Sequence, residues 1–187
     1  MDARDGRLLR DGTDPTIVFE RHLAAPPAAV WAALTDPERI RSWFVRTELE
    51  PRVGGRIVEH HDHAGLSMAG VVTRFEPPRA FGHNWWADAS ATREMGSILW
   101  ELTPDGDTGT RLRVTNVVSH GGDPIGPLAG WHISLDVLAD VLAGADGTDH
   151  RPPAGHFDAG GWTETQSGTG HWRRRAELEA GYRADLG

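Results

Sequence analysis

The densest group of side chains able to transfer protons or bind a metal is the run Glu59-His60-His61-Asp62-His63. A carboxylate beside an imidazole can hold the opposite protonation state and shuttle a proton near neutral pH. Adjacent residues of a strand point to opposite faces, so only His61 and His63 could share an ion, and no zinc motif of fixed spacing such as HExxH occurs. The spacing therefore favours acid–base groups, and we expect no metal and no cofactor.

The composition narrows the possible chemistry. The 187-residue chain contains no Cys and no Lys, which excludes a thiol nucleophile, a cysteine metal site, a Schiff base and a phosphate-binding lysine. Any catalysis is left to carboxylate and imidazole groups. The 19 arginines stand against 27 acidic residues, a net charge of −8, and this balance argues against nucleic acid, whose phosphates require positive charge.

Membrane association is not expected either. No apolar run reaches the roughly 20 residues that span a bilayer. The first segment, MDARDGRLLRDG, is charged and lacks the apolar stretch of a signal peptide. We therefore expect a cytoplasmic protein.

The elements that must position these groups follow from the hydrophobic pattern. Residues 16–22 are typical of a strand, and two short helices follow. At the start of the second, Thr35 and Glu38 have the spacing of a capping box, and Asp36 before Pro37 fits a cap followed by proline at the first helical position. From about residue 45 to 120 the period is two, with regular turn signals, which indicates an antiparallel sheet. The longest helical pattern, 125–143, has an apolar stripe with Asp136 opposite. The stripe consists of Leu128, Trp131, Leu135, Leu138 and Leu142.

These elements predict an α+β fold in which a curved antiparallel β-sheet wraps around a long C-terminal α-helix, with two short helices after the first strand. The expected boundaries are 1–144 for this domain, 145–170 for a Gly/Pro-rich loop, and 171–187 for a C-terminal helix on the same domain. Trp162 and Trp172 lie in or near the loop, so we expect it to fold back over the domain or over a partner.

Motifs of helix starts, turns and core aromatic residues follow one another over about 17–144. They are Phe19-Glu20-Arg21, Ala25–Glu38, Trp43-Phe44, Val53–Arg56, Phe75–Arg79, Gly109–Leu112 and Gly130-Trp131-His132. In this order they resemble the SRPBCC (START/Bet v-like, helix-grip) superfamily, and within it the bacterial homologues of the activator of heat-shock-protein-90 ATPase. The resemblance implies a cavity between sheet and long helix, which in that superfamily typically holds an apolar small molecule or hosts cyclase-type or hydrolytic chemistry.

Strand alternation indicates which side chains face this cavity. The apolar face of residues 97–103 and 110–119 turns His83, Trp85 and Asn116 inward. The resemblance makes Ile57 inward, so Glu59 and His61 would be inward too, although a one-residue slip would place both in solvent. The candidate acid–base residues are Glu59, His61 and His83. The candidate ligand contacts are Met68, Trp85, Trp100, Asn116, Trp131, His132 and Leu135.

Three functions remain open at this point. The first is binding of an apolar or aromatic small molecule in the cavity. The second is a small-molecule enzyme of cyclase, dehydratase or hydrolase type that uses the Glu and His groups. The third is a co-chaperone-like interaction protein. The other partner considered is a second copy of the chain, which Trp86 on the outer face could contact.

Overall fold

The computed structural model describes residues 6–10, 12–86, 94–119, 122–158 and 161–186. Eight antiparallel strands form one sheet in the order β1-β2-β8-β7-β6-β5-β4-β3. The strands are β1 (Arg7–Leu9), β2 (Thr16–Leu23), β3 (Arg46–Leu49), β4 (Arg56–His61), β5 (Leu66–Glu76), β6 (Ala80–Trp86), β7 (Glu94–Asp105) and β8 (Gly109–Val118).

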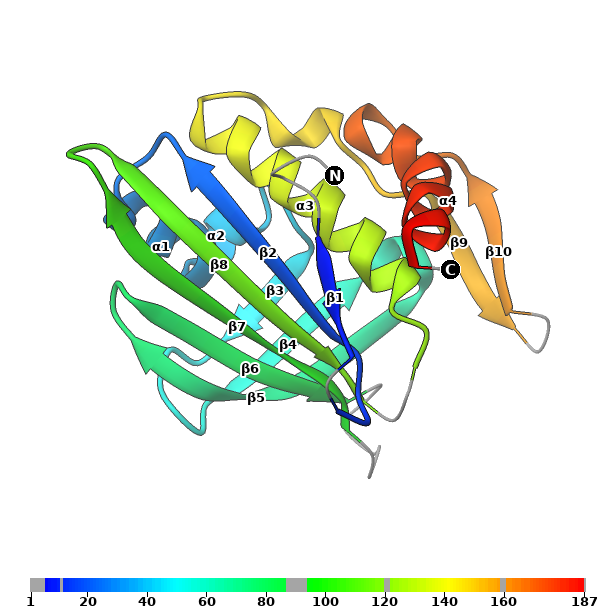
Figure 1. Cartoon of the computed structure of the whole chain (residues 1–187), viewed down its shortest axis with the longest axis horizontal. Coiled ribbons are helices and arrows are strands. Elements are labelled where there is room, and N and C mark those ends of the chain that lie inside the picture. The colour runs from blue at the N-terminus through cyan, green and yellow to red at the C-terminus, as the bar shows by residue number, and fades with distance from the viewer. Residues whose placement is uncertain (1–5, 11, 87–93, 120–121, 159–160, 187) are drawn as a thin grey trace.

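Four α-helices accompany the sheet. They are α1 (Pro27–Thr35), α2 (Pro37–Ile40), α3 (Ile125–Leu142) and α4 (Arg175–Leu186). Figure 1 shows α3 along the hollow face of the sheet, with α4 on the far side of α3 and with α1 and α2 toward one end. This arrangement confirms the predicted α+β helix-grip fold.

The core forms where the central strands face α3. Phe19 on β2 and Leu112 on β8 are buried on one side, and Leu128 and Leu138 of α3 are buried on the other. By length and composition alone α3 would pass for a membrane-spanning helix. Its apolar residues instead pack against the sheet, which is typical of a core helix.

The start of α2 has the predicted cap at Asp36 followed by Pro37 and not the alternative capping box of Thr35 and Glu38. Asp36, rather than Thr35, is the N-cap, and its Oδ1 accepts a hydrogen bond from the backbone N–H of Glu38 at 3.0 Å. The Thr35 hydroxyl donates to the carbonyl of Trp31 at 2.9 Å and so completes α1. Pro37 occupies the first turn of α2, because its missing N–H is not needed there.

The segment expected to be a loop contains regular structure. It begins with a 3₁₀ turn, η3 (Gly147–Asp149), and continues into a hairpin of β9 (Ala154–Asp158) and β10 (Gly161–Gln166). A second 3₁₀ turn, η4 (Gly170–Arg174), precedes α4, so the α-helix begins later than the expected residue 171. The many glycines and prolines of this segment favoured a loop in the sequence prediction. Strands of only five and six residues give too short a pattern to indicate a hairpin among them.

Candidate ligand-binding cavity

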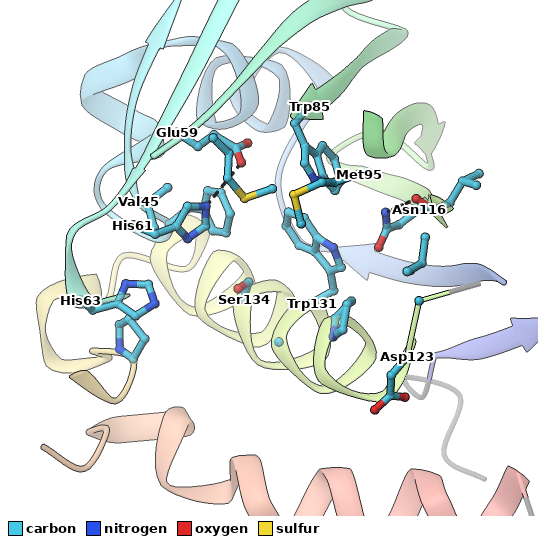
Figure 2. A pocket seen from close by; sticks show the side chains of 18 of the residues that line it. Val45, Glu59, His61, His63, Trp85, Met95, Asn116, Asp123, Trp131 and Ser134 are labelled. Atoms are coloured by element: carbon cyan, nitrogen blue, oxygen red, sulfur yellow. Dashed lines mark hydrogen bonds and ion pairs between the residues drawn. The ribbon is translucent and has the colours of Figure 1, made fainter. Parts of the chain in front are cut away.

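A cavity of about 780 Å³ lies beside α3 on the side that faces the sheet. Figure 2 shows side chains from α3 and from the strands projecting into it. The strands β4 to β8 line one side, and α3 lines the other. The lining residues used below are Trp43, Phe44, Glu59, His61, His63, Met68, Trp85, Glu94, Met95, Asn116, Asp123, Gly130, Trp131, Ser134, His150, Pro152 and Trp172.

Stacked and edge-on aromatic rings build one wall. Phe44 and Trp131 stack with ring centroids 5.2 Å apart. Trp100 lies behind Trp131, edge-on at 5.3 Å, and meets Trp43 edge-on at 6.0 Å. Trp43 is fixed in turn, because its Nε1–H donates to the carbonyl of Ala33 at 2.8 Å. The aromatic wall is therefore held by the core beneath it.

One carboxylate and two histidines form the buried polar end. Glu59 Oε2 lies 3.6 Å from His61 Nε2, and Glu59 Oε1 lies 3.6 Å from His83 Nε2. Burial raises the pKa of Glu59, but its contact with His61 and the nearness of His83 outweigh burial and bring that pKa below its ordinary value. Burial lowers the pKa of His83, against the opposing effect of Glu59. The arrangement thus keeps Glu59 ionised and His83 neutral at neutral pH.

His63 stands at the mouth of this end, in the 3₁₀ turn η1 (Asp62–Ala64). Burial and then the nearby His61 and Arg175 lower the pKa of His63 to about 4, and Asp62 opposes them. The His63 ring is therefore neutral at neutral pH.

Asn116 supplies a polar group on a different wall. Its Nδ2 donates to the carbonyls of Ser97 at 2.9 Å and Val117 at 3.2 Å. These two bonds fix which end of the amide is nitrogen. The buried Oδ1 has no hydrogen-bond partner. An acceptor is thus left open beside the cavity.

Residues 145–153 and 167–174, the two legs on either side of the β9–β10 hairpin, form what we call the strap. His150, Pro152 and Trp172 of the strap line the cavity. The legs are joined because the N–H of Thr169 donates to the carbonyl of Arg151 at 2.8 Å, and the N–H of Arg151 donates to the Thr169 hydroxyl at 3.0 Å. The expectation that this segment folds back over the domain is met by this placement.

A clasp fastens the strap to α3. The rings of His150 and His171 stack with centroids 4.5 Å apart, and His171 Nε2 lies 2.8 Å from Asp140 Oδ2. His150 Nε2 lies 3.8 Å from the same oxygen. The N–H of His171 donates to His150 Nδ1 at 3.0 Å.

Asp140, His150 and His171 are also the group whose ligand atoms lie close enough to hold a metal ion, all within 4.8 Å of one another. The hydrogen bond to His150 Nδ1 works against this use. A neutral imidazole that accepts at Nδ1 carries its proton on Nε2, the atom that faces Asp140. To bind a metal through Nε2, His150 would have to move this proton to Nδ1 and so lose the hydrogen bond from the backbone N–H of His171. The arrangement therefore suits a hydrogen-bonded clasp.

Replacing Gly170 by Ala is expected to loosen the strap. Gly170 has φ of +55°, and an added Cβ would collide with His150 Nδ1. The left-handed backbone alone disfavours Ala by about 1–2 kcal/mol, which makes local opening roughly 5- to 30-fold more frequent. Trypsin should cleave after Arg173 and Arg174, which are exposed in the strap, faster by about that factor. The matched Gly181→Ala variant on α4, where a Cβ meets nothing, should be cleaved at the wild-type rate; equal rates for all three proteins would contradict the strained clasp.

The structure brings six of the ten predicted site residues to the cavity. These are Glu59, His61, Met68, Trp85, Asn116 and Trp131. His83 points inward but lies behind Glu59 and does not line the space. Trp100 and Leu135, expected as ligand contacts, are instead core residues, 3% and 0% exposed.

His132, the remaining predicted contact, faces away from the cavity. Its Nδ1 lies 2.7 Å from the hydroxyl of Tyr182 on α4, and its Nε2 lies 3.6 Å from Asp136. Asp136, which the helical pattern places opposite the apolar stripe, is paired with the buried Arg21 at 3.8 Å. The two contacts come from different elements, because Tyr182 belongs to α4 and Arg21 belongs to β2.

Several lining residues were missed by sequence reasoning. Ser134 interrupts the apolar stripe three residues after Trp131, which is a signal that could have identified it. Glu94 and Met95 come from the start of β7, before the stretch where alternation was applied. His150 and Pro152 reach the cavity only through the tertiary position of the strap, for which no local pattern exists.

Solved structures support the assignment of the helix-grip fold. CalU16 from Micromonospora echinospora is 22% identical with a TM-score of 0.64, over 96% of this chain and 93% of that one. A conserved protein of unknown function from Enterococcus faecalis, EF2215, is 18% identical with a TM-score of 0.70, over 99% and 92%. DynU16, from the dynemicin biosynthetic locus, is 22% identical with a TM-score of 0.62, over 71% of this chain and 49% of that one. At these identities the likeness shows the fold alone.

Among curated proteins, none matches this sequence. The family model described as "Activator of Hsp90 ATPase homolog 1-like protein" matches residues 24–143, which is more than half of the chain. The matched stretch runs from the end of β2 to the end of α3 and leaves the strap and α4 outside. The chain therefore belongs to the family of activator of Hsp90 ATPase homolog 1-like proteins, within the SRPBCC superfamily.

Proposed function

We propose that the protein binds an apolar or aromatic small molecule in the cavity between the sheet and α3. One observation carries the proposal: a space of about 780 Å³ is walled mainly by aromatic and apolar side chains, with a few polar groups. Ligand pockets typically measure about 300–1,000 Å³ and have this mixture of walls. SRPBCC-type folds commonly bind hydrophobic ligands, which supports the same conclusion.

A ligand in the cavity would also explain why two tryptophans, Trp85 and Trp172, are exposed to it. Trp85 and Trp172 line it from opposite elements, a central strand and the strap. Tryptophan contributes a large apolar surface and a single N–H donor, so it can cover a ring-bearing ligand and still orient a polar substituent. A bound ligand would stabilise the folded chain by mass action.

Replacing Gly130 by Phe is expected to block the cavity without unfolding the protein. Gly130 lies on α3 and lines the cavity, and an added Cβ there meets nothing within 4 Å. Any residue other than Pro is also a better helix former than Gly, by up to about 1 kcal/mol. We expect the neutral fluorescent probe N-phenyl-1-naphthylamine to bind the wild type at one saturable site and the variant at least about tenfold more weakly, a loss of about 1.4 kcal/mol.

Gly181→Phe is the matched control for this measurement. Gly181 lies in α4, is exposed, and likewise offers open space to a Cβ. This variant should bind the probe as the wild type does. Unchanged probe affinity in folded Gly130→Phe, or no saturable binding by the wild type, would contradict the proposed function.

The polar end favours a second candidate function, a small-molecule enzyme of cyclase, dehydratase or hydrolase type. Its support is the contrast between ionised Glu59 and neutral His83 at 3.6 Å, since a buried carboxylate that stays ionised can act as a general base. Glu59 and His61 line the cavity, and His83 would act as a positioning residue behind Glu59.

Mass spectrometry of the ligands that co-purify with the wild type and with Glu59→Gln separates the two candidates. An enzyme should yield product from the wild type and accumulated substrate, of different mass or fragmentation, from Glu59→Gln. Identical ligands from both proteins would contradict catalysis by Glu59 and leave binding as the function. Circular dichroism on the same samples checks that both proteins are folded.

A further inference from the structure

The charged groups that line the cavity, apart from its histidines, are carboxylates. Glu59, Glu94 and Asp123 line it, whereas no arginine does in the part of the chain that the structure describes. Lysine is absent from the whole sequence. Figure 2 shows Glu59 and Asp123 on different walls, so negative charge is not confined to one corner.

These carboxylates are not neutralised by arginine among the described residues. Within the described part of the chain, the ion-pair partners of Glu59 are His61 and His83. The Oε2 of Glu94 accepts from the side-chain amide of Asn84 at 2.9 Å. The Oδ1 of Asp123 accepts from the backbone N–H of Ile125 at 3.1 Å. Neutral donors orient the two latter groups but leave their charge in place.

Two histidines at the polar end, His63 and His83, add little positive charge at neutral pH. Burial lowers the pKa of His83, and the pKa of His63 falls to about 4. Arg175 acts on His63 from outside the lining, and it is engaged with Glu179 at 2.9 Å. These three side chains therefore do not cancel the negative charge of the lining carboxylates.

One unsatisfied acceptor points to the same kind of partner. Asn116 Oδ1 is buried and has no donor among the described residues. Its Nδ2 is occupied by two backbone carbonyls, so Asn116 can offer a ligand only an acceptor. A ligand group that carries hydrogen-bond donors would satisfy this atom, whereas a group that only accepts would leave it unpaired.

The aromatic walls favour positive charge as well. Trp43, Phe44, Trp85, Trp131 and Trp172 all line the cavity. The faces of these rings are electron-rich and attract a cation, most strongly where water is excluded. Carboxylates together with tryptophan faces provide a good environment for an organic ammonium group.

We infer that the ligand is an organic cation, a protonated amine on an aromatic or apolar frame, and that the cavity rejects carboxylate ligands such as fatty acids. This inference rests on the proposed function, because it specifies which small molecules the same cavity takes. An anionic ligand would bring like charges together in a medium of low dielectric constant, and no described arginine in the lining would compensate.

Three naphthalene probes of nearly equal size test the inference by isothermal titration calorimetry at neutral pH. They are 2-(aminomethyl)naphthalene, 2-naphthalenemethanol and 2-naphthoic acid, which are cationic, neutral and anionic. We expect the amine to bind at least about tenfold more tightly than the acid, with the alcohol between them. Glu59→Gln and Glu94→Gln should each reduce the preference for the amine over the alcohol by a factor of about three or more.

Glu38→Gln is the control, because Glu38 is exposed on α2 and does not line the cavity. Its binding preferences should equal those of the wild type. If the alcohol binds but the acid equals or exceeds the amine, the charge inference is overturned while the proposed function stands. If none of the three probes and no N-phenyl-1-naphthylamine binds, the proposed function fails with it. Should Glu59→Gln not fold, Glu94→Gln alone decides.

Discussion

Trp100→Ala is expected to destabilise the protein by about 3–5 kcal/mol, the range for removing a large aromatic side chain from a core. Trp100 is 3% exposed and lies edge-on to both Trp43 and Trp131, so its removal leaves a cavity beside these two rings on the inner face of β7. In a chain of this length the loss corresponds to roughly 6–20 °C in melting temperature. Urea unfolding followed by far-ultraviolet circular dichroism measures the change.

Trp85→Ala is the matched comparison. Trp85 is only partly buried and lines the cavity, with the His83 ring 5.5 Å away. Its removal should weaken binding of N-phenyl-1-naphthylamine more than it lowers stability. Trp100→Ala should do the reverse while the variant remains folded. Equal stability loss in the two variants would mean that the separation of core from cavity wall is incorrect.

The contrast between these two tryptophans shows what the sequence could predict. Alternation along a strand tells which residues face inward, and it correctly turned His83, Trp85 and Asn116 toward the interior. Alternation does not indicate how deeply an inward side chain is buried. Whether an inward side chain meets the core or an open space depends on how the covering helix crosses the sheet, and no local pattern encodes that crossing.

The register of β4 was the weakest point of the sequence reasoning. Ile57, Val58 and Glu59 are all buried in the structure, so burial does not alternate there, and the pattern could not distinguish the two registers. The resemblance to the family gave the inward phase for Ile57. The cavity lining by Glu59 and His61 agrees with that phase.

The long helix illustrates a different limit. Its apolar stripe predicted the side that meets the sheet, but α3 is covered on a second side by α4. His132 was predicted as a ligand contact and Asp136 as a residue opposite the apolar stripe, yet both lie against residues that are distant in sequence, Tyr182 and Arg21. Helical periodicity reveals neither where the C-terminal helix docks nor which residue of β2 faces α3.

Stability is expected to fall as the pH drops below about 6.5, the ordinary pKa of histidine. His83 is 3% exposed, and burial lowers its pKa in the folded protein. In the unfolded chain this histidine binds a proton near its ordinary pKa. The unfolded state therefore takes up a proton that the folded state refuses, so acid favours unfolding until the pH reaches the lowered pKa.

His63 and Glu59 act in the same direction. The pKa of His63 is lowered to about 4, so its contribution is lost between its ordinary value and pH 4, and its partial exposure makes it the smaller effect. Glu59 has a lowered pKa and gives stability above its ordinary value of 4.5, which is lost as the pH falls further. Acid unfolding should therefore begin with the histidines and continue with Glu59.

Urea unfolding of the wild type and of His83→Gln, from about pH 8 to about pH 5, measures the contribution of His83. One histidine that stays neutral in the folded state lowers the free energy of unfolding by at most about 1.4 kcal/mol per pH unit below its unfolded pKa. Over one and a half pH units this amounts to about 2 kcal/mol, and His83→Gln should lack it. His22→Gln, at a side chain 69% exposed, is the control and should keep the wild-type slope. If His83→Gln retains the full pH dependence, His83 is not the buried neutral group that holds Glu59 in place, and the polar end of the cavity would have to be protonated differently.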